Sequence, residues 1–152
     1  MKTDGVVLSR VVADAGRALA FYRDGLGMAG AKQMFGIVCL ELPGLTLFLA
    51  EPADFARNTG LEPGTGLEPG TGLEPGTGLG HAGGDGVLSC AIGSTAEVDQ
   101  LLAAARSAGG TAVEPHVIDH SSGRKQYVGT MTDPDGYVWQ LVCNIQQQGE
   151  GT

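Results

Sequence analysis

The chain carries one pattern of segments twice, and this duplication restricts the folds that it can adopt. The residues from Val6 read VVLSRVV, and those from Gly86 read GVLSCAI. Further along, ELPGLTLFL matches TDPDGYVWQL when Gly44 is set against Gly136, at a larger offset than the first match. The larger offset indicates a longer middle loop in the second copy, which we place at HVIDHSSGRK. The sequence therefore predicts two related modules.

The first copy reads as a strand, a helix and then two or three strands. The stretch 6–12 is rich in β-branched residues, which is typical of a strand. Asp14 can accept hydrogen bonds from the unpaired amides that begin the following helix. We expect Gly25 or Gly27 to end this helix, because glycine adopts a positive φ angle without strain. The strands AKQMFGIVCLEL and LTLFLAEP follow, joined by a tight Pro-Gly turn.

The second copy repeats this order of elements. A strand is predicted over 87–92, and Ser94 or Thr95 can cap the next helix, with Glu97 placed for a capping box. The helix should stop at the Gly-Gly pair, and strands are predicted at TAVEP, QYVGTMT and YVWQLVCN. The last two are joined by a DPDG turn. The predicted fold class is α+β, with two tandem βαβββ modules.

The boundaries follow from these elements and from a short repeat between the copies. We expect a first module at 1–55, a linker at 56–85, a second module at 86–146 and a flexible tail at 147–152, in one structural domain overall. Within 60–79 the unit GLEPGT occurs three times and begins a fourth time. Proline and glycine favour turns over helix, so the repeat reads as a turn-rich tether. A partner-binding epitope is the alternative interpretation.

Composition and charge exclude several classes of partner. The 152 residues are 42% hydrophobic and carry a formal net charge of −8, without a basic run. Nucleic acid and anionic membranes would be repelled, so neither is expected as a partner. Charged residues near the start argue against a signal peptide, and no apolar segment reaches transmembrane length. The three widely spaced cysteines read as reduced thiols, which predicts a cytoplasmic protein.

Two strings, ADAGRALAFYRDGLGM near the start and DPDGYVWQLV near the end, are informative in combination. Together they resemble the vicinal oxygen chelate superfamily, which includes glyoxalase I, extradiol dioxygenases and bleomycin resistance proteins. Members of this superfamily are built from paired βαβββ modules whose strands curl around a cavity, and many are dimers. The resemblance thus implies a curved mixed sheet around a cavity and a homodimer. It covers nearly the whole chain apart from the region 60–85.

The resemblance also implies where a metal ion would be held. Metal-dependent members place a His or Gln on the first strand of each module and a Glu on the last strand. By register, these positions fall on Val7 and Phe48 in the first module and on Val87 and Gln140 in the second. Two valines and a phenylalanine offer no donor atom to a divalent ion. We therefore expect no metal site, no cofactor and no catalytic residue.

The histidines are the remaining candidates for a metal site. His81 follows the repeat in a glycine-rich stretch, and His116 and His120 flank Asp119 in the predicted loop. A loop imposes no common face on this spacing. We interpret the three histidines as solvated loop residues rather than as ligands.

Alternation along the strands predicts the lining of the cavity. Ser9, Thr46, Ser89 and Val138 should share a face with the four positions above, whereas Trp139 should face a helix. Phe35 and Tyr127 are predicted on middle strands, where stacking on a flat ligand and packing in the core are equally open. Glu41 is interpreted as solvent-facing, with a cationic ligand as the alternative. The predicted ligand-binding residues are Val7, Ser9, Phe35, Phe48, Val87, Ser89, Tyr127 and Gln140.

A largely apolar lining with a few hydroxyls and one amide is typical of a site for a small organic molecule. The first hypothesis is a protein that sequesters a small, apolar or aromatic molecule such as an antibiotic. The alternative is a vicinal oxygen chelate enzyme, a lyase, isomerase or dioxygenase, of unknown substrate. For an enzyme without metal, the candidate general bases are Glu41, His116 and His120. A third hypothesis is a homologue whose main property is dimerisation.

Overall fold

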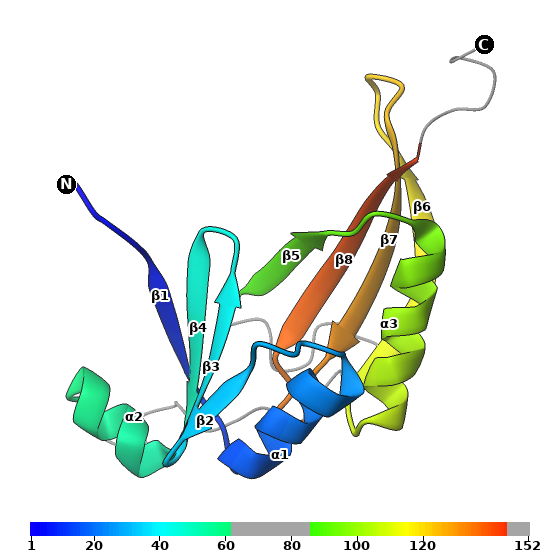
Figure 1. Ribbon diagram of the computed structural model, residues 1–152. Coiled ribbons are helices and arrows are strands. Elements are labelled where there is room, and N and C mark those ends of the chain that lie inside the picture. The colour runs from blue at the N-terminus through cyan, green and yellow to red at the C-terminus, as the bar shows by residue number, and fades with distance from the viewer. Residues whose placement is uncertain (62–85, 146–152) are drawn as a thin grey trace. The chain divides into compact units, whose positions relative to one another are not determined.

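The computed structural model describes residues 1–61 and 86–145 (Figure 1). They form two compact units, which lie within Met1–Gly70 and Thr71–Thr152. Each unit holds one copy of the duplicated pattern and is described by itself. Most of the repeat, His81 and the predicted tail lie outside the described residues.

The first unit places three strands after its first helix and then adds a second helix. Its elements are β1 (Val7–Val11), α1 (Ala15–Leu19) with a π-helical continuation over Ala20–Gly25, β2 (Lys32–Met34), β3 (Ile37–Leu42), β4 (Leu45–Ala50) and α2 (Pro52–Thr59). The elements of the second unit are β5 (Val87–Ala91), α3 (Thr95–Ser107), β6 (Thr111–Asp119), β7 (Lys125–Thr132) and β8 (Val138–Ile145). Both units contain the βαβββ order, so the predicted α+β fold of two tandem modules is confirmed.

The two sheets also have the same topology. The strand order is β1-β4-β3-β2 in the first unit and β5-β8-β7-β6 in the second. In each sheet the first strand pairs in parallel with the last strand, and the other neighbours are antiparallel. The first and last strands of each module are therefore neighbours, which brings residues far apart in the sequence onto one sheet face.

Local signals in the sequence set the ends of the helices. Asp14 Oδ1 accepts from the Arg17 amide over 2.9 Å, and Ser94 Oγ accepts from the Glu97 amide over 3.1 Å. Each contact satisfies one of the unpaired amides of a first helical turn. After α1, Gly27 has a φ of 77°, which is in the region that favours glycine. These caps were predicted from the sequence.

One face of each sheet is covered by its module's helix. In the first unit, Phe21 and Tyr22 are buried and meet edge to face, with ring centroids 4.9 Å apart. In the second unit, Gly129 lies directly under α3, because a Cβ added there would lie 2.8 Å from a methyl group of Leu102. Val98 of α3 is equally close to that position. Burial of such apolar side chains supplies most of the driving force for each module.

The structure corrects two predicted boundaries. The predicted linker begins at residue 56, but α2 continues to Thr59 and ends at Gly60, whose φ is 76°. The predicted loop HVIDHSSGRK is strand at its two ends, because β6 runs on to Asp119 and pairs with β7, which begins at Lys125. The register of β6 shifts between Val113 and His116. Pro115 lies in this irregular stretch of an edge strand, where a missing amide donor is tolerated.

Candidate functional site

The second sheet has a face that α3 does not cover, here called the open face. Residues at alternate positions of β8 reach it, and the strand register gives their neighbours. One row across the sheet is Ser89, Gln140 and Thr130, and the next row is Ala91, Val142 and Val128. A third row joins Asn144 to Gln126. Across β5, β8 and β7, the open face thus has two polar rows with an apolar row between them, and on β6 the apolar row ends at His116.

The first polar row contains a strong side-chain contact. Ser89 Oγ donates to Gln140 Oε1 over 2.6 Å, between strands β5 and β8. This bond occupies the carbonyl oxygen of the Gln140 amide and fixes the orientation of that group. Among the described residues, none accepts a hydrogen bond from Gln140 Nε2. The amide therefore presents its N–H₂ group to a molecule on the open face, while the bond from Ser89 uses one of the two lone pairs of its oxygen.

The second polar row is a chain of three side chains. Gln126 Nε2 donates to Asn144 Oδ1 over 3.0 Å, and His120 Nε2 lies 2.7 Å from Gln126 Oε1. Because an amide oxygen only accepts, His120 must carry its proton on Nε2 in this contact. The chain of donors then runs from His120 through Gln126 to Asn144. As in the first row, an amide N–H₂ group stands at its end.

The first sheet has a corresponding face, which is partly covered. Ser9 pairs with Phe48, and Phe48 also pairs with Cys39 of β3. Val7 lies at one end of this face and is 54% exposed. At the other end Phe55 of α2 packs against Val11 and Ala50, together with Ile37. The accessible part of this face therefore extends from Val7 to Phe48 and Cys39.

Six of the predicted site residues lie on these two faces. They are Val7, Ser9 and Phe48 in the first unit and Val87, Ser89 and Gln140 in the second. Val87 pairs with Val138 and is 46% exposed, so it is accessible to a small molecule.

Phe35 and Tyr127 are placed differently. Phe35 was predicted on a strand but lies in the turn between β2 and β3, with a φ of 54° and 86% exposure. Gln33 Nε2 donates to the Phe35 carbonyl oxygen and holds this turn. Tyr127 lies on β7, as predicted, but on the face that α3 covers, together with Gly129 and Met131.

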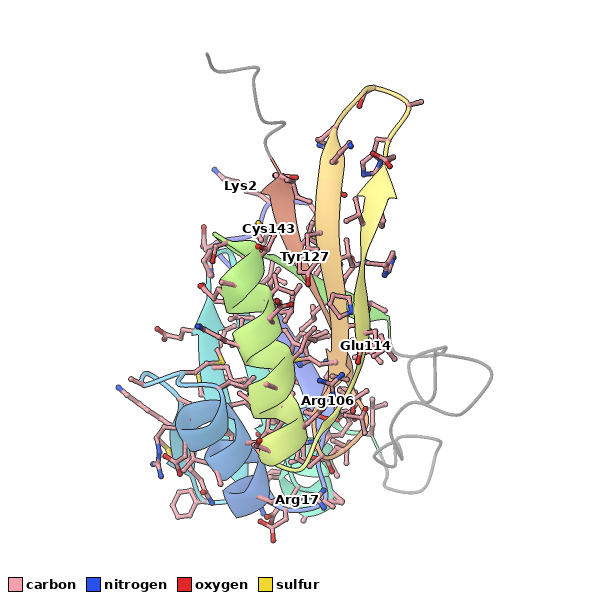
Figure 2. The ribbon with its side chains drawn as sticks, turned by 90° about the vertical axis from the view of Figure 1, so that its right-hand side faces the viewer. Lys2, Arg17, Arg106, Glu114, Tyr127 and Cys143 are labelled. Atoms are coloured by element: carbon pink, nitrogen blue, oxygen red, sulfur yellow. The ribbon has the colours of Figure 1, made fainter. Side chains whose placement is uncertain are left out.

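Contacts with α3 hold Tyr127 on this covered side. Its hydroxyl donates to Asp99 Oδ1 of the helix over 2.6 Å. Figure 2 shows Tyr127 beside α3, on the side of the sheet where Arg106 and Glu114 also lie. The hydrogen bond to Asp99 is the main cause that raises the pKa of the Tyr127 hydroxyl above its usual value. Tyr127 is thus part of the contact between helix and sheet, and we leave it out of the candidate site.

The residues at the four family positions do not fit a divalent metal ion. Val7, Phe48 and Val87 have no donor atom, and the only oxygen of the Gln140 side chain already accepts from Ser89. Within residues 1–61 and 86–145, no group of three or more His, Cys, Asp and Glu side chains could hold a metal ion. A divalent ion requires several such donors.

Two titratable residues of β3 share the face of Phe48, since Cys39 pairs with Phe48 and Glu41 pairs with Thr46. Partial burial, and to a lesser extent the Glu41 carboxylate, raises the pKa of the Cys39 thiol. A protonated thiol is a poor ligand and a poor nucleophile. This face of the first sheet therefore suits contact with an organic molecule better than covalent or metal chemistry.

Sequence reasoning did not identify Gln126 or Asn144 as parts of a site, and it considered His120 only as a disfavoured metal ligand and as a candidate general base. Asn144 lies four residues after Gln140, so strand alternation alone could have placed it on the same face. Gln126 and His120 had no such signal, because their contacts depend on the pairing of β6 with β7 and of β7 with β8.

Comparison with known proteins identifies the class of this two-module α+β protein. The family model of the Glyoxalase/Bleomycin resistance protein/Dioxygenase superfamily matches residues 6–141. The chain belongs to this superfamily, as the sequence predicted. No helix of the described residues is long and apolar enough to cross a membrane.

Solved structures agree with this assignment at the level of the fold. A hypothetical protein from S. aureus is 23% identical, with a TM-score of 0.66 and 94% of each chain covered. A glyoxalase-related enzyme from Fulvimarina pelagi is 20% identical, with a TM-score of 0.67, and covers 94% of this chain and 89% of its own. Lactoylglutathione lyase from Agrobacterium tumefaciens is 18% identical, with a TM-score of 0.57 and coverage of 94% and 95%. No curated protein matches the chain.

Proposed function

We propose that the protein binds a small, largely apolar or aromatic organic molecule, such as an antibiotic, and sequesters it without a metal ion and without changing it. The observation that carries the proposal is the bond between Ser89 and Gln140 at the centre of an accessible sheet face. Gln140 is the only polar side chain at the four positions where metal-dependent members of the family hold a metal ion. The bond to Ser89 orients it as a hydrogen-bond donor. Val87 and Val142 flank it with apolar surface.

The physical argument concerns what such a face can recognise. Apolar side chains bind a ligand through burial, at about 25 cal/mol per Å² of apolar surface removed from water. A few fixed polar groups then select the ligand and its orientation. Each accessible face supplies this combination by itself. In the second sheet, the Ser89 hydroxyl and the Gln140 amide lie on the same face as Val87, and in the first sheet the Ser9 hydroxyl lies beside Phe48.

Calorimetric titration with a panel of aromatic natural products tests the proposal. We expect at least one compound to bind with one-site behaviour and to be recovered unchanged by mass spectrometry. The Gln140→Ala variant should bind that compound about tenfold more weakly, because one oriented donor is lost. Gln100→Ala is the matched control, since Gln100 is an exposed residue of α3. Its affinity should equal that of the wild type.

Other outcomes would support the enzyme hypothesis or reject both. Recovery of a chemically altered compound would show that the protein is an enzyme and does not only sequester its ligand. Glu41, His116 and His120 would then be the first candidate general bases to test. Of these, Glu41 lies opposite Thr46 on β4, and His116 lies opposite Val128 on β7. Stoichiometric nickel, iron, manganese or zinc in purified protein would contradict the metal-free proposal. Failure of every compound to bind would contradict ligand binding itself.

A further inference from the structure

The two polar rows of the second sheet present the same chemical group. In the first row, Ser89 holds the Gln140 oxygen, so Gln140 Nε2 is directed away from that bond. In the second row, Gln126 holds the Asn144 oxygen, so Asn144 Nδ2 is directed away in the same manner. In both amides, a neighbour that donates to the oxygen fixes the orientation of the group, so that the N–H₂ donors point away from that neighbour.

Cooperation within the second row strengthens its donor. His120 Nε2 donates to the same Gln126 side chain that donates to Asn144. Hydrogen bonds in a chain polarise one another, so Asn144 Nδ2 is a better donor than an isolated amide. Asn144 is exposed, and a ligand can reach it.

The surface between the two donors is apolar. Val142 lies between Gln140 and Asn144 on β8, and its neighbours across the sheet are Ala91 and Val128, of which Val128 is buried and lies next to His116 of β6. Four residues of extended strand separate the Cα atoms of Gln140 and Asn144 by about 13 Å. This length corresponds to two linked aromatic rings with a substituent at each end.

We propose that the ligand is an elongated aromatic molecule with an uncharged hydrogen-bond acceptor, such as a carbonyl oxygen, at each end. One acceptor binds Gln140 Nε2 and the other binds Asn144 Nδ2, while the rings cover Val142. The acceptors are uncharged because both donors are neutral amides and the chain carries a net charge of −8, which repels anions. This inference rests on the proposed function and specifies its ligand class.

Three compounds of one shape test the inference, namely biphenyl, para-acetylbiphenyl and para,para′-diacetylbiphenyl. Their dissociation constants for the full chain are measured by calorimetry. We expect each added acetyl group to increase the affinity about threefold to tenfold, the range for one hydrogen bond to a fixed donor. Equal affinities would overturn the inference while leaving ligand binding intact.

Two isosteric variants assign the effect to the named atoms. Gln140→Glu keeps the oxygen that accepts from Ser89, and Asn144→Asp keeps the oxygen that accepts from Gln126, but both remove the outward N–H₂ donor. In each variant we expect the preference for diacetylbiphenyl over biphenyl to fall about threefold to tenfold. Gln100→Glu introduces the same charge on the exposed surface of α3 and should leave the preference unchanged.

The remaining outcomes separate this inference from the proposed function. If the aromatic natural products bind but no biphenyl does, the ligand class is wrong and the sequestering function stands. If no compound of either set binds, the proposed function fails as well. An unchanged preference in both isosteric variants would place the ligand elsewhere and would overturn the inference. The thermal unfolding of each variant is recorded to show that it folds.

Discussion

The Tyr127 hydroxyl donates to Asp99 Oδ1 over 2.6 Å, and this contact joins the middle of β7 to α3. Only the protonated hydroxyl can donate, so the contact opposes ionisation of Tyr127. The pKa of the Tyr127 hydroxyl is accordingly raised in the folded chain, chiefly by this hydrogen bond. The hydrogen bond between Tyr127 and Asp99 stabilises the folded chain fully below the ordinary tyrosine pKa of about 10. This stabilisation is lost as the pH rises through the higher pKa of Tyr127 in the folded chain.

We therefore predict that Asp99→Asn lowers the pH at which one of the three tyrosines ionises. The variant removes the negative charge beside the hydroxyl, which also contributes to the raised pKa. A spectrophotometric titration of tyrosinate measures the change, and Tyr127→Phe should remove the same transition. Gln100→Ala, on the next residue of α3, should titrate like the wild type. An unchanged curve for Asp99→Asn would show that the contact does not form in solution.

Single residues also show what strand alternation can predict. Ser89 and Gln140 were predicted on one face, and the structure brings them into contact, because alternation is a property of the strand itself. Tyr127 was left open between stacking and core packing, since its face depends on the register with β8. Phe35 was misplaced, because its turn is held by Gln33 and its φ of 54° is unusual for a bulky residue.

Among the elements, α2 is the one that the sequence did not predict. Its first residue, Pro52, is suited to the start of a helix, yet the segment is short and is followed by the glycine-rich repeat. The helix gains stability from one apolar anchor, Phe55, which is 7% exposed and packs against Val11 and Ala50. Glu51, just before α2, accepts from the Ala15 amide at the start of α1 over 2.8 Å. Tertiary contacts of this kind are not visible in local sequence.

We predict that Phe55→Ala destabilises the chain by about 3 kcal/mol, the lower end of the range for a buried phenylalanine. The loss arises because the variant uncovers Val11 and Ala50 and removes the anchor of α2. Chemical denaturation measures the free energy of unfolding. Arg57→Ala is the control on the same helix, because its ion pair with Asp54 is largely exposed on the arginine side and should contribute less than about 1 kcal/mol. Equal effects of the two substitutions would contradict the anchoring role of Phe55.

The strand β6 shows why the middle of the second module was mispredicted. Its residues Glu114 and Pro115 interrupt the regular pairing, and the sequence HVID resembles a loop after a proline. Pairing resumes at His116 opposite Val128 and continues to Asp119 opposite Lys125. This long hairpin forms through contacts between strands, which override the weak local preference. His116 therefore belongs to a sheet face and not to a loop.

At the scale of the whole molecule, the duplication predicted most of the fold. The same strand order in both sheets follows from two copies of one βαβββ pattern, which the sequence carries in matching strings. The faces of the candidate site were harder to predict, because they combine strands from opposite ends of each module. Ser89 and Gln140 are 51 residues apart and meet only because β5 and β8 pair in parallel.

The repeat between the modules allows a prediction for the complete chain. Within the described residues, each module has its own sheet and its own helical cover, and we expect the GLEPGT units not to be needed for either core. Doubling the length of a loop that is free to move costs only about 0.6 kcal/mol of closure free energy. We therefore predict that deletion of two repeat units changes the melting temperature by no more than about 3 °C, since 1 kcal/mol corresponds to a few degrees in a domain of this size. The affinity for an aromatic ligand should remain within about threefold of the wild type, because a change of about 0.6 kcal/mol corresponds to a factor of just under three. Differential scanning calorimetry and ligand titration measure the two quantities.

Replacement of the same residues by a Gly-Ser segment of equal length separates the effect of length from that of sequence. A large fall in melting temperature on deletion, but not on replacement, would show that the length of the segment matters. A fall in both variants would assign the repeat sequence a specific contact.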